Sequence, residues 1–332
     1  MNKLVAIIIA LLLFTLFSVL AGLNFGPANI SSSEVLQCLL ANCQDEISQI
    51  VIWQVRVPRV LVALVAGMGL AIAGAILQNT TRNPLADPYL FGIVSGAGLG
   101  ATIANLVIND ALAGQLDIAL PLAAFLGALF AITVVVFIAK ILQSMDQLLL
   151  AGVAVSFMLA SVTQFILYFG EPFATNRVIF WLMGSLSRVE MSNFYVIVSV
   201  LLIVIIAIIA LHRQIDALLL GDESAASLGV NVDKLRLLML GLCAALTATI
   251  VAYCGGIGFV GLMIPHIVRQ IIGVTTLRLV LGSALIGGCF LIWVDIIARS
   301  ALVDAEIPIG IITSALGSIF FIFIMLKSRH RN

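Results

Sequence analysis

The feature that most constrains this chain is a succession of long apolar runs with almost no charge. Leu4–Leu23 and Val196–Leu211 are two of them, and such runs approach the ~20 residues that a helix needs to cross the ~30 Å apolar core of a bilayer. A membrane-spanning β-strand would instead alternate apolar and polar side chains over about 10 residues. The unbroken runs therefore predict an all-α membrane protein.

The composition extends this conclusion to the whole chain. Of the 332 residues, 62% are apolar and 10% are charged, whereas soluble domains have about 45–50% and about 25%. The apolar excess is spread from end to end, so we expect one transmembrane domain, residues 1–332, in contact with the lipid bilayer. Sixteen Lys and Arg balance sixteen Asp and Glu, and this balance gives no basic surface for nucleic acid.

The apolar runs divide into ten candidate transmembrane helices. They cover residues 4–23, 59–78, 89–108, 118–140, 147–168, 194–212, 235–254, 257–271, 278–299 and 308–326. The eighth is short and is interrupted by Pro265. An even number of spans places both termini on one side of the membrane.

The distribution of basic residues indicates which side that is, because cytoplasmic loops are enriched in Lys and Arg. With the N-terminus inside, the inner loops and helix ends hold eleven basic residues: Lys3, Arg82, Lys140, Arg213, Lys234, Arg236, Arg269, Arg278, Lys327, Arg329 and Arg331. The outer ones hold five: Arg56, Arg59, Arg177, Arg188 and Arg299. Both termini are therefore predicted to be cytoplasmic. The first run lacks a signal-peptidase pattern, so we interpret it as a retained helix.

The sequence shows no machinery for catalysis or for an energy source of its own. None of the four lysines follows a glycine, so there is no Walker A motif, and Gly256–Gly261 matches G-x-G-x-x-G only between two apolar runs, where we expect a tight helix junction. No metal site, cofactor site or catalytic residue is predicted. The centres of the spans are uncharged, and the nearest exceptions, Asp295 and Arg299, can pair with each other at i,i+4. Without a buried relay, proton-coupled transport is disfavoured.

Cysteine usage adds little. Cys38 and Cys43 share a predicted outer loop, where a disulfide is allowed, but two unpaired thiols are the preferred interpretation. The remaining three, Cys243, Cys254 and Cys289, lie in apolar runs and are expected to pack in the core.

Glycine and loop patterns mark two further features. Gly92, Gly96 and Gly100 recur every four residues, a spacing that lets helices approach closely; packing within the chain is the main interpretation, and a pathway or dimer role is the alternative. Residues 79–88 contain two prolines and several turn-forming residues, typical of a rigid connector or gate at the cytoplasmic face.

The polar inner segment 213–234 is long for this chain. Asp222 is expected to act as a helix N-cap, Glu223 lies in the first turn, and Gly229 is a plausible end of the helix. A short surface helix is therefore predicted, either as a solvated loop element or as a docking element for a cytoplasmic partner.

Two outer arginines run against the positive-inside trend. Arg56 and Arg59 flank Pro58, which suits a first helical turn. They are expected either to extend to lipid headgroups or to meet an acidic partner outside.

A series of ordered motifs resembles the FecCD/BtuC family, the permease subunits of ATP-driven (ABC) importers for iron chelates, haem and vitamin B12. The motifs lie at Arg56–Arg59, Ala73–Gln78, Arg82–Pro88, Phe91–Gly98, Leu150–Val153, Trp181–Ser185, Gly221–Gly229, Gly258–His266 and Pro308–Ile311. The resemblance covers nearly the whole chain.

The resemblance implies a ten-helix permease in the bacterial inner membrane that works as a dimer, here expected as a homodimer. Two separate ATPase subunits would dock at the coupling residues, and a periplasmic binding protein would dock at the outer arginines. The implied coupling residues are Asp222, Glu223, Ser224, Ala225, Ala226, Leu228 and Gly229, and the implied docking residues are Arg56, Arg59 and Arg299. The implied gate candidates are Asn83, Pro84, Leu85, Met145 and Asp146, although Met145–Asp146 differ from the small hydroxyl residues of the vitamin B12 member.

These features favour an importer permease over an ATPase-independent channel or carrier, and both over an enzyme. The resemblance places iron chelates, ferric siderophore or haem, first among the cargoes, with vitamin B12 and molybdate as alternatives.

Overall fold

The computed structural model describes residues 2–28, 30–43, 45–105, 116–142, 145–302 and 305–329, and every regular element in those ranges is helical. The α-helices are α1 (Asn2–Asn24), α2 (Ser32–Leu39), α3 (Glu46–Ile50), α4 (Val57–Thr81), α5 (Ile93–Ile103), α6 (Leu116–Leu142), α7 (Met145–Tyr168), α8 (Pro172–Leu182), α9 (Met191–Leu218), α10 (Asp222–Ser227), α11 (Val232–Cys254), α12 (Val260–Ile271), α13 (Thr276–Ser300) and α14 (Ile309–Arg329). The all-α prediction is confirmed.

Each of the ten apolar runs contains a helix. Within the described residues, eight helices are long and apolar enough to cross a membrane, whereas α5 and α12 are apolar but shorter. The run at 257–271 becomes helical only at Val260, since residues 255–258 form the expected junction after α11.

The second run is part of a longer helix than its sequence indicated. Helix α3, the π-helical segment Val51–Arg56 and α4 follow one another without a break, so the rod extends from Glu46 to Thr81. Pro58 lacks an N–H to donate to the preceding turn. The wider π-turn directly before it accommodates this, and Val57 N–H donates to the Ile52 carbonyl, five residues earlier.

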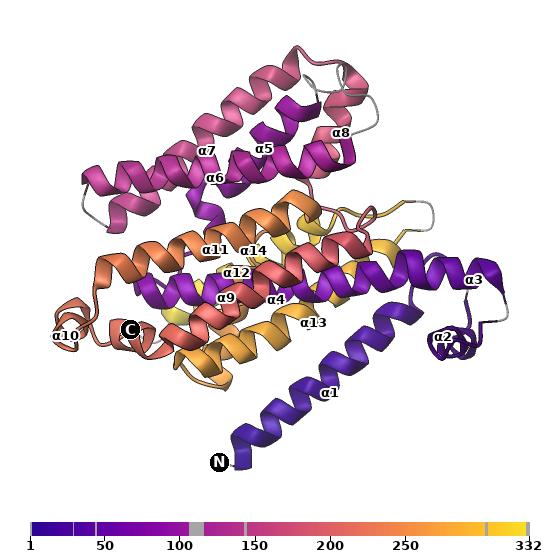
Figure 1. The fold of residues 1–332 in the computed structure, drawn as a ribbon, viewed down its shortest axis with the longest axis horizontal. Coiled ribbons are helices and arrows are strands. Elements are labelled where there is room, and N and C mark those ends of the chain that lie inside the picture. The colour runs from indigo at the N-terminus through magenta and orange to yellow at the C-terminus, as the bar shows by residue number, and fades with distance from the viewer. Residues whose placement is uncertain are drawn as a thin grey trace.

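Helix α4 is the centre of the packing. It crosses the middle of the molecule (Figure 1). In the most apolar stretch of the helix Glu46–Thr81, 83% of the residues are buried, whereas the figure for α1 is 11%. A Cβ at Gly67 would overlap the Gly287 carbonyl of α13, and one at Gly74 would overlap Gly261 of α12. These glycines let three helix backbones approach directly, as in other membrane helix pairs.

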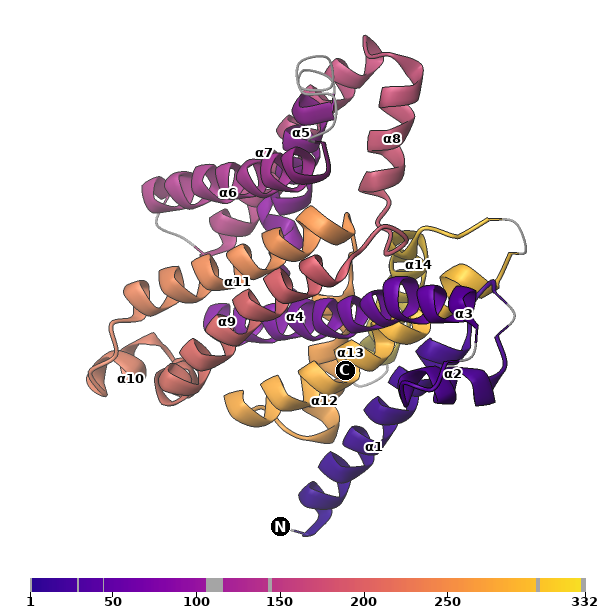
Figure 2. The ribbon, with the colours of Figure 1, turned by 45° about the vertical axis from the view of Figure 1, so that its right-hand side comes forward.

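Helices α5, α6 and α7 form a second group beside α11 (Figures 1 and 2). A Cβ at Gly96 or Gly100 would overlap the carbonyls of Gly127 and Ala123 on α6, so both glycines lie in a close helix contact. Gly92 does not continue this pattern: it precedes α5 with φ +77°, a left-handed conformation that favours glycine. The helical repeat of glycines therefore does not include Gly92, but a Cβ at Gly92 would still lie 3.6 Å from Ala131 of α6 and 3.4 Å from Ser156 of α7.

Three short helices outside the ten runs were not predicted. Helices α2, α3 and α8 each begin at a residue whose side chain accepts a backbone N–H of the first turn: Ser31, Asp45 and Glu171. A search for runs of spanning length passes over such elements, because their signal is a cap and not a long apolar segment.

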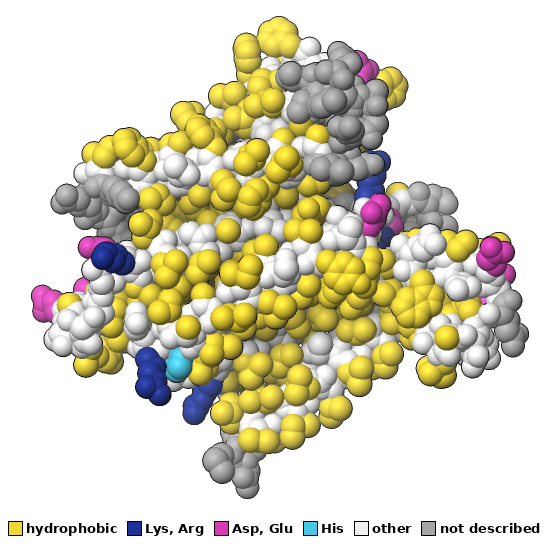
Figure 3. All heavy atoms as spheres, in the orientation of Figure 1, with side chains coloured by type: hydrophobic (Ala, Val, Ile, Leu, Met, Phe, Trp, Pro, Cys, Tyr) yellow, Lys and Arg dark blue, Asp and Glu magenta, His cyan; other side chains and the backbone are white. Residues whose placement is uncertain are grey.

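The surface has the polarity of a membrane protein. On the face in Figure 3, hydrophobic side chains cover the middle, and charged side chains gather near the ends where Figure 1 labels α10 and α3. Large apolar side chains such as Leu13 and Phe17 on α1 are more than half exposed. This is a multi-pass membrane protein.

Candidate coupling site and outer arginine cluster

The predicted surface helix of the inner segment exists, with its start displaced by one residue. Helix α10 spans Asp222–Ser227, and Gly221, not Asp222, is its N-cap. Asp222 is the first helical residue, because its side chain bonds elsewhere and does not cap the helix. Beyond the last turn, Gly229 has φ +82° and the chain leaves the helix, as expected.

The two faces of α10 differ. Glu223, Ser224, Ala226, Ser227 and Leu228 are exposed, whereas the Ala225 side chain is fully buried. Leu228 is 65% exposed, an unusual position for a large apolar side chain at a polar end of the molecule. The outward face is therefore free within this chain to receive a partner.

Asp222 faces inward and joins two arginines. Its Oδ1 accepts Nη2–H of Arg82 and Nη2–H of Arg236, both at 2.8 Å, and its Oδ2 accepts Nη1–H of Arg236 at 2.9 Å. The hydrogen bonds from Arg236 are the main reason that the pKa of Asp222 lies below its ordinary value. The carboxylate is thus ionised and held in a bidentate pair.

Both arginines connect this carboxylate to the end of α4. Arg236 also donates its Nε–H to the Thr80 carbonyl at 2.9 Å. Arg82 is the C-cap of α4 and has φ +52°, a left-handed conformation that is uncommon for residues other than glycine. The first residue of α10 is therefore bonded to the last turn of α4 by two routes.

The same end of α4 is bonded to α12. Arg269 donates to Gln78 Oε1 and, at 3.0 Å, to Asn79 Oδ1, while Gln78 Nε2–H donates to the Gly261 carbonyl at 3.0 Å. Residues 78–82 are consequently the meeting point of α4, α10, α11 and α12.

The turn after α4 contains the first set of gate candidates. Leu85 N–H donates to Asn83 Oδ1 at 2.9 Å, and the Leu85 side chain is exposed, next to Pro84. Asp87 is buried and accepts Tyr89 N–H at 2.8 Å, and burial raises the pKa of Asp87 to about 6. These two hydrogen bonds give the turn a defined backbone conformation.

The second set of gate candidates is only partly visible. Met145 and Asp146 begin α7, but their side chains, like residues 143 and 144 before them, lie outside the described residues.

The end of the molecule that the sequence predicts to lie outside, called the outer end below, contains the predicted arginines, but they are buried. Arg56 is 2% exposed; its Nη1 donates to the carbonyls of Leu23 and Asn24 at 2.8 and 3.1 Å, and its Nη2 donates to that of Ala28 at 2.6 Å. Arg56 thus satisfies carbonyls at the C-terminal end of α1, where a cation is favourable.

Arg59 and Arg299 share one buried carboxylate. Arg59 Nε–H donates to Asp295 Oδ1 at 2.8 Å, and Arg299 Nε lies 3.2 Å from Asp295 Oδ2, the expected i,i+4 pair. This second contact is an ion pair without hydrogen-bond alignment. Arg299 instead donates to the Gly22 carbonyl at 2.7 Å.

Glu306 closes this cluster from the outside. Its carboxylate accepts Nη1–H and Nη2–H of Arg59 at 2.8 and 2.9 Å, and its side chain remains 36% exposed. The premise that Arg56, Arg59 and Arg299 present free positive charge at an exposed rim is therefore corrected. All three are buried, because acids and carbonyls of the same chain surround them.

Sequence reasoning missed Glu306 and the Asp222 pairs. Glu306 lies 247 positions from Arg59, so no local pattern could join them. Asp222 and Arg236 are 14 residues apart on different helices, and only the intervening turn brings them together.

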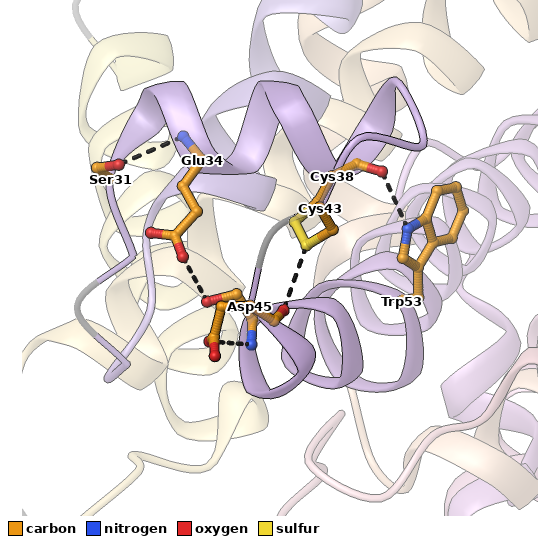
Figure 4. Close-up of a disulfide and its surroundings, with 7 residues drawn as sticks. Ser31, Glu34, Cys38, Cys43, Asp45 and Trp53 are labelled. Carbon is orange, nitrogen blue, oxygen red and sulfur yellow. Dashed lines mark hydrogen bonds between the residues drawn. A yellow bond between two sulfur atoms is a disulfide. The ribbon is translucent and has the colours of Figure 1, made fainter.

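Cys38 and Cys43 are bonded to each other, which corrects the expectation of two free thiols (Figure 4). The bond joins Cys38, in the last turn of α2, to Cys43, in the loop before α3. Nearby, Ser48 Oγ–H donates to Glu34 at 2.7 Å, and Trp53 Nε1–H donates to the Cys38 carbonyl at 3.3 Å. The end of α2 and the start of the next helix are therefore held together by one disulfide and two side-chain hydrogen bonds.

A cavity of about 510 Å³ lies between α5, α7 and α8. Its described lining includes Ser95, Thr163, Gln164, Tyr168 and Thr175 and contains no charged side chain. The cavity can form hydrogen bonds to a bound molecule through hydroxyl and amide groups, but it has no charged side chain to hold that molecule tightly.

Comparisons with known proteins agree with this architecture. The FecCD transport family matches residues 11–327. An ABC transporter permease protein of Methanocaldococcus jannaschii is 36% identical over 330 residues, 97% of this chain and 94% of the relative. The vitamin B12 import system permease protein BtuC of Salmonella paratyphi A is 37% identical over 281 residues, 84% of this chain and 85% of the relative.

Solved structures give the same result. A metal-chelate type ABC transporter in an inward-facing conformation superposes with a TM-score of 0.84 at 30% identity, covering 97% of this chain and 99% of that one. PsaBC from Streptococcus pneumoniae, at 14% identity, has a TM-score of 0.60 over 87% of this chain and 94% of its own, and shares the fold. Together with the matched sequence, these comparisons show that the chain is an ABC importer permease of the FecCD transport family.

Proposed function

We propose that this permease carries a metal chelate, a ferric siderophore or haem, across the inner membrane of a bacterial cell, and that a separate ATPase supplies the energy. The observation that carries the proposal is the near-complete structural similarity to a metal-chelate type transporter. The uncharged lining of the cavity between α5, α7 and α8 is compatible with it, because conduction needs a site that releases its cargo.

The proposed topology has ten spans and two cytoplasmic termini. The eleven-to-five division of basic residues supports it. The Cys38–Cys43 bond adds support, because it would put the loop after α1 in an oxidising compartment. In a cysteine-free background, single cysteines at Ser32 and Ser224 should label from outside and inside respectively; labelling of both from one side would refute the topology.

The proposed partners fit the two ends of the molecule. Two ATPase subunits dock on the exposed face of α10, and a second copy of the chain completes a homodimer. The turn Asn83–Leu85 and the start of α7, Met145–Asp146, act as gates. These assignments rest on the family and on the exposed side chains of α10.

A periplasmic binding protein is proposed to dock at the outer end. Because Glu306 occupies both Nη atoms of Arg59, an acidic side chain of the partner has to exchange with Glu306 to reach this guanidinium. Glu306→Gln should therefore speed docking, and electrostatic effects of this kind appear mainly in the association rate. Slower docking of Glu306→Gln would instead assign the binding contact to Glu306 itself.

The cargo is tested by uptake into proteoliposomes that contain the permease, its ATPase and its binding protein. Labelled ferric siderophore or haem should accumulate, and the permease alone should not bind the chelate with submicromolar affinity. Vitamin B12 is the second candidate, favoured by the 37% identity to BtuC. If cobalamin or molybdate accumulates and neither iron compound does, the cargo proposal fails and the importer remains.

A further inference from the structure

We propose that Asp222 is a positioning residue that fixes α10 to the cytoplasmic end of α4, so that a displacement of α10 is transferred to α4 and to the turn 82–88. The inference rests on the proposed docking of the ATPase on α10. It assigns Asp222 to the joint between α10 and the permease core and leaves the contact with the partner to the exposed residues of the helix.

The first step of the argument is the division of α10 into two faces. The exposed residues of this segment are Glu223, Ser224, Ala226, Ser227, Leu228 and Gly229. Asp222 bonds to Arg82 and Arg236 on the inward side of α10, and the Ala225 side chain is buried. A force applied to the outer face therefore reaches the core through these two positions and the ends of the helix.

The second step is the strength and direction of the inward contact. Two parallel N–H···O bonds from Arg236 fix the orientation of the Asp222 carboxylate as well as its distance. Arg236 holds the Thr80 carbonyl with its third nitrogen. One guanidinium thus connects the first residue of α10 to the last turn of α4, and a movement of one cannot leave the other unaffected while these bonds persist.

The third step leads from α4 to the turn. Arg82, the second partner of Asp222, is the C-cap of α4, and Asn83 follows it directly. The turn is internally bonded at Asn83–Leu85 and at Asp87–Tyr89. Because these hydrogen bonds stiffen the turn, a shift of Arg82 moves the turn as a whole.

The fourth step is that one of the two arginine bonds of Asp222 can open. The side chains of Asp222 and Arg82 are 44% and 43% exposed, so water screens this pair and competes for it. Arg236, at 13% exposure, is the more enclosed partner. We therefore expect the bond between Asp222 and Arg236 to persist, and the bond between Asp222 and Arg82 to open during a transport cycle.

The test compares wild type with Asp222→Asn, which keeps the size of the side chain and removes its charge. The matched control is Asp233→Asn, the same substitution at an exposed acid in the first turn of α11 that is not among the coupling residues. Purified ATPase is added to the permease and binding protein in proteoliposomes, and the measured quantity is cargo taken up per ATP hydrolysed. For Asp222→Asn we expect unchanged ATPase binding and a ratio reduced about tenfold. Asp233→Asn should keep the ratio of wild type.

A second measurement separates the joint from a general loss of structure. Spin labels at Ser224 and Leu85, in a cysteine-free chain diluted with unlabelled chain, report the distance between α10 and the turn. Wild type should give one narrow distribution, and Asp222→Asn a broad one, with the same oligomeric state. Arg236→Lys, which keeps the charge but loses the two-point contact, should broaden it as well.

The outcomes distinguish this inference from the proposed function. If the ATPase binds and both the uptake ratio and the distance distribution of Asp222→Asn equal those of wild type, the joint is refuted while the docking site stands. If the ATPase does not bind α10 in the wild-type permease, the proposed docking fails first. A reduced ratio with a broadened distribution and intact binding supports the joint.

Discussion

The two ends of α4 are both tied by arginines to acids, but in opposite environments. At the outer end, Arg59 and Asp295 are 5% and 1% exposed, and the cluster is closed by Glu306. At the inner end, Asp222 and Arg82 are nearly half exposed. A buried ion pair that loses one partner leaves an uncompensated charge, whereas an exposed pair exchanges with water at small cost. The outer cluster is therefore a fixed anchor, and the inner one is a joint that can open.

The largest effect is expected at the outer anchor. Asp295→Ala removes the acid shared by Arg59 and Arg299 and should lower the free energy of unfolding in detergent by about 3–5 kcal/mol. Glu306→Gln is the matched variant on the partly exposed side of the same guanidinium and should cost about 1 kcal/mol or less. Denaturant titration of both proteins checks this. Equal losses would remove the distinction between the buried and exposed parts of the cluster.

The next effect concerns Asp87, the buried acid of the inner end. No salt bridge reaches it among the described residues, and its pKa is raised to about 6. Between about pH 4 and pH 6 the folded state holds a proton that the unfolded state has lost, so stability falls as the pH rises through this window. At pH 7.5 the penalty is complete, and Asp87→Asn should stabilise the protein by up to about 3 kcal/mol.

The pH dependence provides the control for that variant. The difference in free energy of unfolding between Asp87→Asn and wild type should shrink as the pH is lowered from 7.5 to 5, because the Asp87 carboxyl of wild type then gains its proton. Unfolding titrations at several pH values measure the difference. An advantage that is the same at both pH values would mean that the ionised carboxylate is compensated inside the turn.

The smallest effect is expected at the inner joint. Asp222→Asn should lower the free energy of unfolding by about 1 kcal/mol or less, and added salt should narrow the difference from wild type. The lowered pKa of Asp222 means that the contribution of the pair is present above its ordinary value near 3.8 and is lost only in more acidic solution. A loss as large as that of Asp295→Ala, insensitive to salt, would contradict the contrast between the two ends.

Much of the fold could be predicted because its signals are local. Long apolar runs give helices wherever a bilayer has to be crossed, and the i,i+4 spacing of Gly96 and Gly100 indicates a close helix contact that the structure contains. Gly92 broke the same pattern, since a left-handed turn precedes α5 and the helical spacing does not extend through it. The length of the second helix was missed because a π-helical turn lets the helix continue across Pro58.

The candidate sites were less accessible from the sequence. The sequence around Arg59 indicates an exposed cation, because its partners Asp295 and Glu306 lie far along the chain and only the fold brings them to it. Asp222 resembles an N-cap because it stands before a short helix, and its choice of Arg236 over the backbone depends on tertiary contacts. The surface helix itself was predictable because a run of polar residues, small residues and a terminal glycine is a local signal.

The most direct test of the account is ATP-driven uptake by variants of α10. Ala226→Pro should break the ladder of this short helix, at a cost of about 3 kcal/mol or more, whereas Ala226→Ser keeps the ladder and serves as the matched control. In proteoliposomes with ATPase and binding protein, wild type and Ala226→Ser should take up the chelate only with ATP, and Ala226→Pro, although inserted in the membrane, should not. Uptake that persists without the ATPase, or that is unchanged in Ala226→Pro, would contradict the account.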